Sequence, residues 1–361
     1  MPVSSKPVLV TGASGFIASR IVEQLLARGY RVRGTVRSLT KGAEIARLKE
    51  LPGASERLQL VPAELLAPGA FDDAARGVEY VLHTASPYVL DVKDPQRDLV
   101  DPAVSGTENL LEACAKGGEV KRVVLTSSMA AVTDEPDGDV TLTESDWNTK
   151  SSLTRNPYYY SKTLAERAGW KFCYGTDAPP GGHAQSKVGF GLVAINPFMV
   201  VGPSLTPALN TSNQLFVDLM AGVYPGIMNL HWGFVDVRDV AVSHVEAMER
   251  ANAAGRYLCA NEALSMRAVV EQLVKLGYGD RKLPKLSLDC GIGDYVVRLS
   301  SYTQPKGVGS YLRTHVGRTP RFDHGKLVRD LGIRFLPLEQ TIAETLRDLD
   351  KWGHLNAKAS S

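Results

Sequence analysis

The chain has 361 residues and a net charge of +2, so its charge balance gives no reason to expect nucleic acid or an anionic membrane as a partner. A hydrophobic share of 44% is ordinary for a globular protein, and no apolar run reaches the ~18 residues that would span a bilayer. The N-terminal segment leads straight into a strand-like run, so we expect no signal peptide. The four widely spaced cysteines are expected to be reduced thiols in a cytoplasmic protein, with no metal-ligand spacing among them.

Short apolar runs alternate with amphipathic stretches through the first half of the chain. We predict strands at residues 8–11, 31–36, 58–61, 80–83 and 121–126, and helices at 17–28, 43–51, 71–75 and 104–115. This alternation is typical of a parallel sheet that is covered by helices on both faces. The sequence therefore predicts an α/β fold with a Rossmann-type, doubly wound parallel sheet.

The second half is less regular. A polar stretch at 133–157 is predicted to be a surface loop, followed by a helix at 158–174, a loop at 177–187 and a buried strand at 188–195. Further on we predict helices at 237–250 and 338–352 and a strand at 257–260. We expect the sheet domain to comprise residues 1–202 with 235–260, and a smaller mixed region to comprise residues 203–234 with 261–361.

A loop of small residues joins the first predicted strand to the first predicted helix. It reads Thr11-Gly-Ala-Ser-Gly-Phe-Ile-Ala18. Gly12 allows a tight turn, Gly15 lets the backbone approach a pyrophosphate, and Ala18 permits close packing of helix against sheet. The N–H groups at the start of the helix attract phosphate. The spacing differs from the Gly-x-Gly-x-x-Gly fingerprint, and the lack of Gly-Lys-Ser/Thr argues against a P-loop that hydrolyses ATP or GTP.

The end of the second predicted strand indicates which dinucleotide binds. NAD sites usually carry an acid here, which accepts hydrogen bonds from the ribose hydroxyls. This chain instead offers Arg33, Arg37 and Lys41. Because a guanidinium fits a 2′-phosphate, we predict NADPH, with Arg37 as the best candidate for that contact. The alternative is that these residues are solvated surface cations.

Tyr158 and Lys162 lie four residues apart at the start of a predicted helix, so they share one helical face. A free phenol titrates near ~10, and a nearby ammonium lowers its pKa. Tyr158 is therefore predicted to donate a proton to a carbonyl oxygen as hydride reaches the carbon, and Lys162 to hold the nicotinamide ribose. Tyr159 and Tyr160 are predicted to be packing residues.

Polar residues end two of the predicted strands, where ligands bind in an open α/β sheet. Ser127 and Ser128 end the fifth strand and alternate in direction, so only one can face the site and polarise a substrate oxygen. Capping of the strand end is the alternative role. His83 ends the fourth strand and is predicted to be a packed histidine rather than a base. The lack of a Gly-x-Ser-x-Gly elbow argues against a hydrolase.

Several stretches resemble the extended short-chain dehydrogenase/reductase family. Within it the chain is most similar to the group of dihydroflavonol 4-reductases, cinnamoyl-CoA reductases and fungal aldehyde and ketone reductases. The matching residues are 10–17, 35–37, 83–87, 105–109, 125–128, 158 with 161–162, 196–197 with 201–203, and 235–239.

The resemblance implies an NADPH-dependent reductase of aldehydes or ketones with a catalytic triad of Ser128, Tyr158 and Lys162. It also implies that Asn109 supports the lysine through water, and that Glu64 stands where many members have an aspartate beside the adenine. The sheet domain then becomes an NADP-binding domain. The full set of expected cofactor contacts is Thr11, Gly12, Ser14, Gly15, Phe16, Ile17, Arg37, Lys41, Glu64, Leu65, Thr84, Ala85, Ser86, Tyr158, Lys162, Pro197, Val200 and Ser212.

Two departures from the plant enzymes bear on the substrate. Thr133 stands where dihydroflavonol reductases carry an asparagine, and Pro157 stands where cinnamoyl-CoA reductases carry a tryptophan. We therefore expect a general aldehyde or ketone reductase whose C-terminal region binds substrate. From position alone, the predicted substrate contacts are Tyr88, Met129, Thr133, Phe216, Met220 and Tyr224.

Two other functions remain open. A nucleotide-sugar epimerase or dehydratase would share the fold and triad, but an epimerase recycles NAD, and the basic Arg37 argues against that. A protein that binds NADPH only as a sensor would commonly lack the tyrosine or the lysine. The expected partner is a small carbonyl compound, and we expect a monomer or homodimer.

Overall fold

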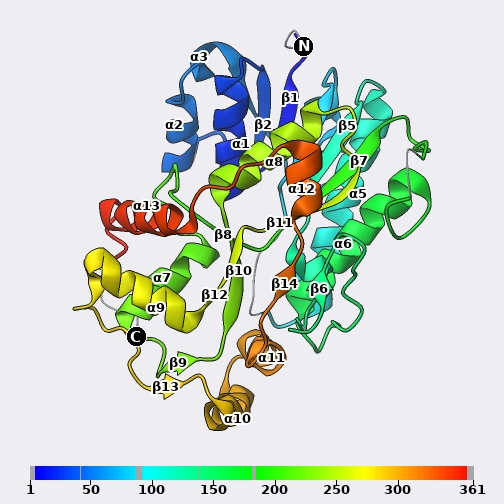
Figure 1. The fold of residues 1–361 in the computed structure, drawn as a ribbon. Coiled ribbons are helices and arrows are strands. Elements are labelled where there is room, and N and C mark those ends of the chain that lie inside the picture. The colour runs from blue at the N-terminus through cyan, green and yellow to red at the C-terminus, as the bar shows by residue number, and fades with distance from the viewer. Residues whose placement is uncertain (1–4, 41, 87–91, 137, 181–183, 356–361) are drawn as a thin grey trace.

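A seven-stranded parallel sheet forms the centre of the fold (Figure 1). The computed structural model describes residues 5–40, 42–86, 92–136, 138–180 and 184–355. The strand order is β11-β7-β5-β4-β1-β2-β3, and every neighbouring pair in it is parallel. This confirms the predicted Rossmann-type fold. The strands are β1 (Val8–Thr11), β2 (Val32–Val36), β3 (Leu58–Pro62), β4 (Tyr80–His83), β5 (Arg122–Thr126), β7 (Gly191–Pro197) and β11 (Gly255–Cys259).

Helices cover both faces of this sheet. Successive strand residues point to opposite sides, and apolar side chains on both sides must be buried. Val8 and Val10 pack beneath one layer of helices, whereas Leu9 packs beneath the other. The first layer contains α1 (Phe16–Ala27), α8 (Val237–Glu249) and α12 (Gly325–Leu331). The second contains α4 (Asp72–Ala75), α5 (Asp101–Gly117) and α6 (Pro157–Tyr174). Two short helices, α2 (Ala43–Lys49) and α3 (Ala54–Arg57), link β2 to β3.

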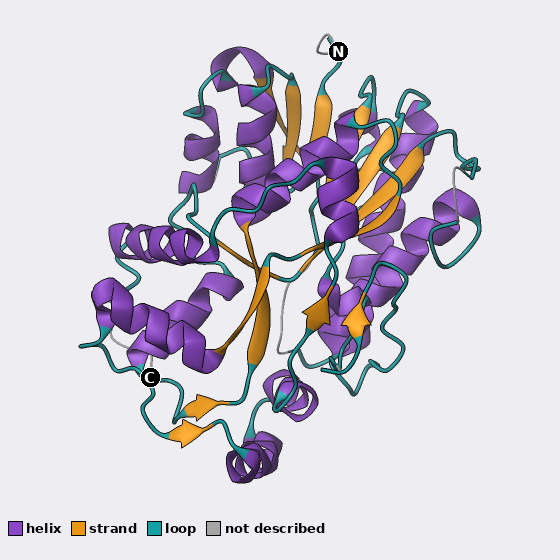
Figure 2. Cartoon of the chain, viewed as in Figure 1, coloured by secondary structure: helices purple, strands orange, loops and turns teal. Residues whose placement is uncertain are grey.

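The rest of the chain builds a second apolar core around a three-stranded sheet of order β12-β10-β8 (Figure 2). Its strands are β8 (Met199–Val201), β10 (His231–Asp236) and β12 (Glu262–Ser265). Around it lie α7 (Thr211–Ala221), α9 (Met266–Leu273), α10 (Gly291–Ser300), α11 (Lys306–His315) and α13 (Leu338–Lys351), with a small pair of strands, β9 (Ile227–Met228) and β13 (Ser287–Leu288). The chain returns to the large sheet through α8 and β11. The exact domain boundaries stay a prediction.

The segment expected to be a plain surface loop, residues 133–157, contains a strand. β6 (Thr141–Leu142) pairs with β14 (Arg321–Phe322) from near the end of the chain. Most of the described residues of this segment are loop, as predicted, and only the two-residue strand was not. A pairing between such distant residues leaves no periodic signal in either short segment. None of the helices in the described part of the chain is both long and apolar enough to cross a membrane.

Candidate active site

The carboxyl ends of β1, β4 and β5 bring three sequence-predicted loops together. Thr11 is in register with His83, the last residue of β4. The Thr11 hydroxyl oxygen accepts hydrogen bonds from the backbone N–H groups of Thr84 and Ala85, both at 3.1 Å. The Thr84 hydroxyl in turn donates to the Thr11 carbonyl at 2.5 Å. The loop after β4 is thereby fixed against the start of the loop after β1.

The loop after β1 has the form that its glycine spacing predicts. Gly12 has φ +63°, and a Cβ there would lie 3.3 Å from Ala85, so a side chain would be strained and crowded. Its N–H donates to the Thr35 hydroxyl at 3.1 Å. Gly15 is the N-cap residue of α1, and no side chain in the described residues caps this helix. The first N–H groups of α1 therefore suit an anionic group at the edge of the sheet.

His83 lies packed inside the protein, as expected. It is 3% exposed, and its Nδ1 shares a hydrogen bond of 2.8 Å with the Thr11 hydroxyl. Burial, together with the nearby charge of Lys162, lowers the pKa of His83 to about 3. The imidazole is thus neutral near pH 7 and fixes the end of β1.

Tyr158 and Lys162 occupy the first turns of α6, which starts at Pro157. The Lys162 ammonium lies 5.8 Å from the centre of the Tyr158 ring. It also donates a hydrogen bond of 2.9 Å to the hydroxyl of Ser86, in the loop after β4. Burial lowers the pKa of Lys162 to about 8. Tyr159 points elsewhere, and its hydroxyl lies 3.4 Å from Nε2 of His315 in α11.

The two serines after β5 have different surroundings. Ser127 is buried, and its hydroxyl donates to the Glu166 carboxylate at 2.5 Å. Ser128 is only partly buried, and its hydroxyl oxygen accepts from the Ala130 N–H at 3.1 Å, at the start of the 3-10 turn Met129–Ala131. Ser128 is therefore the serine that can still face a substrate, and its hydroxyl proton is not used by that capping bond.

The predicted adenine side of the site lies after β3. Asn109 in α5 donates to the Leu65 carbonyl at 3.1 Å. A Cβ on Gly106, one turn earlier, would lie 2.7 Å from the Leu65 side chain, so glycine permits this close packing. Glu64 is exposed. The expected water-mediated link between Asn109 and Lys162 stays a prediction.

The arginines near β2 differ in their partners. Arg33 donates to the carbonyls of Asp73, Ala74 and Arg76, which satisfies the C-terminal end of α4. Arg37 is exposed just beyond the end of β2, on the carboxyl side of the sheet. This position is compatible with a 2′-phosphate contact. Lys41 and Tyr88 lie outside the described residues.

The remaining predicted residues fall into separate groups. Pro197 ends β7 and Val200 lies in β8, while Ser212 is in the first turn of α7. Met129 belongs to a small apolar cluster, and Thr133 accepts a hydrogen bond from the Glu135 N–H. The other three expected substrate contacts belong to the second core, in which Phe216 and Met220 are buried and Tyr224 is partly buried. Contact of these residues with substrate stays a prediction.

Sequence reasoning missed three buried polar residues next to the predicted triad, namely Glu166, Asn196 and Arg256. Glu166 follows Lys162 by four residues on the same helix, and that spacing could have identified it. Arg256 gave no local signal, because its partners come from distant parts of the chain.

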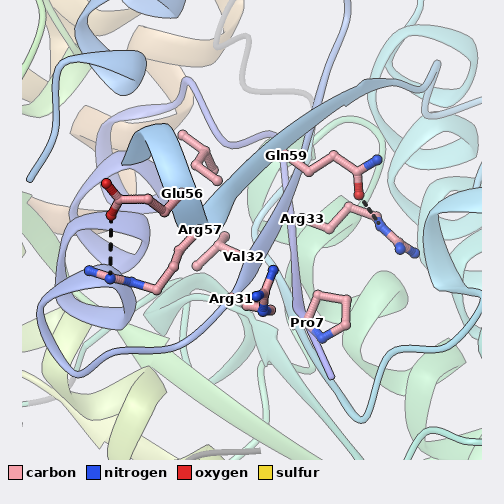
Figure 3. Close-up of a pocket in the computed structure, with 8 residues that line it drawn as sticks. Pro7, Arg31, Val32, Arg33, Glu56, Arg57 and Gln59 are labelled. Atoms are coloured by element: carbon pink, nitrogen blue, oxygen red, sulfur yellow. Dashed lines mark hydrogen bonds and ion pairs between the residues drawn. The ribbon is translucent and has the colours of Figure 1, made fainter. Parts of the chain in front are cut away.

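Figure 3 shows a hollow on the surface at the amino ends of the strands, the end of the large sheet opposite to the candidate site. Pro7 precedes β1, Val32 begins β2 and Leu58 begins β3, so the hollow is at the amino ends of these strands. Arg57 and Glu56 face each other at its rim, with 3.8 Å between their charged atoms. Since ligands in open α/β sheets bind at the carboxyl ends, this hollow is separate from the candidate site.

Comparisons with known proteins place the chain in one family, and the similar proteins reported below are named as reductases. The model of the NAD dependent epimerase/dehydratase family matches residues 8–260. A cinnamoyl-CoA reductase of Medicago truncatula is 39% identical over 350 residues, which cover 95% of each chain. Tetraketide alpha-pyrone reductase 1 of Arabidopsis thaliana is 35% identical over 97% of each chain. The structure of yeast methylglyoxal/isovaleraldehyde reductase Gre2 complexed with NADPH is 31% identical and has a TM-score of 0.76, covering 96% of this chain and 99% of its own.

Proposed function

The chain belongs to the NAD dependent epimerase/dehydratase family, and we propose that it is an NADPH-dependent reductase of aldehyde or ketone carbonyls. The observation that carries the proposal is the juxtaposition of Tyr158 and Lys162 with the loops after β1 and β4. The similar proteins support it, because they are named as reductases and one was solved with NADPH. We further propose that the substrate is a small carbonyl compound, that the protein acts as a monomer or homodimer, and that it works in the cytoplasm.

The residues present fit a dinucleotide. Glycine at position 12 lets the turn pack against Ala85, which a Cβ would crowd at 3.3 Å, and the first N–H groups of α1 follow this turn without a side-chain cap. We infer that this turn and helix end hold the pyrophosphate, while Arg37 holds the 2′-phosphate. The loop Thr84–Ser86 would line the cofactor on the other side. When bound, NADPH supplies the hydride.

The protein's own groups would then supply the proton and orient the carbonyl. Tyr158 would donate its phenolic proton to the carbonyl oxygen, since a proton is needed there as hydride reaches the carbon. The Ser128 hydroxyl would donate a hydrogen bond to the same oxygen and polarise it. The Lys162 ammonium, 5.8 Å from the Tyr158 ring centre, would stabilise the phenolate that forms. Its present partner, Ser86, lies where the ribose is expected.

The test is loss of NADPH absorbance with a panel of aldehydes, ketones, a dihydroflavonol and a hydroxycinnamoyl-CoA. We expect turnover with NADPH and little turnover with NADH. NADPH binding without turnover of any carbonyl compound would contradict the proposal and favour an NADPH sensor. Interconversion of nucleotide sugars with tightly held NAD would instead identify an epimerase.

A further inference from the structure

A fully buried ion pair joins α6, the helix of Tyr158 and Lys162, to β11. The Glu166 and Arg256 side chains are each 0% exposed, with 2.7 Å between Oε1 of Glu166 and Nε of Arg256. A second contact joins Glu166 Oε2 and Arg256 Nη2 at 3.3 Å. Glu166 lies on α6 one turn beyond Lys162, whereas Arg256 comes from β11 at the edge of the large sheet. The pair therefore joins the helix of the predicted proton donor to a distant strand.

The carboxylate of Glu166 also connects to the residues around Ser128. Its Oε2 accepts from the Ser127 hydroxyl at 2.5 Å and from the Asn196 side-chain amide at 2.8 Å. The same Asn196 amide donates to the Ser128 carbonyl at 3.1 Å. Glu166 is thus linked directly to the residue before Ser128, and through one side chain to the backbone of Ser128 itself.

The guanidinium of Arg256 extends the connection to the chain that follows Ser128. Its Nη2 donates to the Ala131 carbonyl at 3.3 Å, at the end of the 3-10 turn that Ser128 caps. Its Nη1 donates to the carbonyls of Glu144 and Asp146, and its Cζ lies 3.9 Å from the centre of the Trp147 ring. The same group therefore also anchors the segment that leads back to α6.

Burial of an ion pair is an inefficient way to stabilise a protein. The loss of hydration often exceeds the attraction, and apolar residues of similar volume are often as stable. What this pair does provide is a defined geometry, because a planar guanidinium and a carboxylate fix each other's orientation. The carboxylate and guanidinium here bond to elements on both sides of the site.

We propose that Glu166 and Arg256 are a positioning pair that fixes Ser128 relative to Tyr158 and Lys162, an inference that rests on the proposed function. Ser128 follows β5, and the other two triad residues lie on α6, so their separation depends on what connects the strand end to the helix. Glu166 is buried, so it acts through its neighbours and not on the substrate.

The decisive variant is Glu166→Gln, which keeps the size of the side chain and removes its charge. Both carboxylate oxygens of Glu166 accept hydrogen bonds, Oε1 from Arg256 and Trp170 and Oε2 from Ser127 and Asn196. The NH2 group of a glutamine only donates, so in either orientation it would face two donors and break their hydrogen bonds. We expect kcat to fall on the order of 10- to 100-fold, as for small misplacements of reacting groups, with little change in KM or in NADPH affinity. Arg256→Lys should behave in the same way, because a lysine cannot reproduce the fork.

Ser127→Ala keeps the ion pair and removes only the hydrogen bond from Ser127 to Glu166. This variant keeps the proposal testable if Glu166→Gln fails to fold. We expect a smaller fall in kcat from this change, with KM unchanged. A kcat equal to that of the wild type in folded Ser127→Ala and Glu166→Gln would overturn the proposal. If only Ser127→Ala folds, its kcat decides alone.

The matched control is Asp236→Asn, which weakens another carboxylate–guanidinium contact. Asp236 has a fully buried side chain and accepts from Arg238 in α8 at 2.6 Å and from Thr341 in α13 at 2.9 Å, neither of which belongs to the triad. We expect this variant to lower the melting temperature without changing kcat. If kcat falls in proportion to the melting temperature in every variant, Asp236→Asn included, the pair has only a structural role and the proposal is overturned. An inactive wild-type protein would instead contradict the proposed function.

Discussion

The ammonium of Lys162 lies 5.8 Å from the centre of the Tyr158 ring, and both side chains project from the first turns of α6. The spacing of four residues places them on one helical face. The burial of Lys162 makes its charge more effective, because fewer water molecules screen it. The two residues thus form a unit at the carboxyl edge of the large sheet, where they meet the loop after β4.

Replacement of Tyr158 by phenylalanine removes only the hydroxyl. If that hydroxyl is the proton donor, kcat should fall by at least about 100-fold, the usual contribution of a positioned acid. The affinity for NADPH should stay near the wild-type value, because the ring and the cofactor loops are unchanged. Steady-state turnover and a fluorescence titration with NADPH measure the two quantities. Retention of a near-wild-type rate would remove Tyr158 from the proposed role.

Arg37→Glu should change the choice of cofactor. A charge-assisted hydrogen bond contributes about 1.5–3 kcal/mol, so KM for NADPH should rise by about 10- to 100-fold relative to KM for NADH. Arg31→Glu is the matched control, since Arg31 is an exposed arginine at the amino end of β2, on the rim of the hollow in Figure 3. Its ratio of the two KM values should match the wild type. An unchanged ratio in Arg37→Glu would exclude the 2′-phosphate contact.

Lys162→Met should raise the stability of the cofactor-free protein near pH 7. Burial lowers the pKa of Lys162 from 10.5 to about 8, so below pH 8 the lysine is charged both when folded and when unfolded, and folding must dehydrate it. Between pH 8 and 10.5 the unfolded chain binds more protons, and the wild-type protein gains stability as pH rises. The stability advantage of the variant should therefore shrink over this range. Melting curves of both proteins from pH 7 to 10.5 would contradict this if the difference stayed constant or grew.

Asn156 precedes α6 and has a left-handed backbone conformation, which alanine tolerates poorly. Its φ is +47°, its side-chain amide donates to the Thr314 hydroxyl at 3.0 Å, and its N–H donates to the Ser310 hydroxyl at 3.0 Å. Asn156→Ala should lower the free energy of unfolding by about 1–3 kcal/mol, from the lost hydrogen bond and the strained backbone. Asn156→Gly, which tolerates the positive φ, should lose about 1 kcal/mol less. Denaturant unfolding that ranks glycine as the more damaging change would contradict this account.

Much of the first half of the fold could be predicted from the sequence because its signals are local. The strands β1, β2, β4 and β5 and the helices α1, α5 and α6 are each encoded by the period of apolar residues within a single segment. The same holds for the glycine turn before α1 and for the spacing of Tyr158 and Lys162. The resemblance to the extended short-chain dehydrogenase/reductase family rested on several of these stretches together with residues 196–203 and 235–239, and it is confirmed.

The second half was harder because its elements are short and pair over long distances. β6 is a two-residue strand whose partner, β14, lies near the end of the chain, so no window of sequence contains the pairing. The helices α10 and α11 were not predicted. α11 contacts the start of α6 through His315 and Thr314, which places C-terminal residues beside the predicted triad.

The sequence by itself determined the fold class, the glycine turn before α1 and the helical face that carries Tyr158 and Lys162, because each depends on residues within a few positions of one another. Only the tertiary structure decided that Ser127 points inward to Glu166 while Ser128 stays partly exposed, and that Lys162 meets Ser86, 76 residues away. It also decided that Arg256 is buried against Glu166, 90 residues away. Such contacts depend on how the sheet and its covering helices pack, and a buried polar group is stable only where that packing supplies its partner.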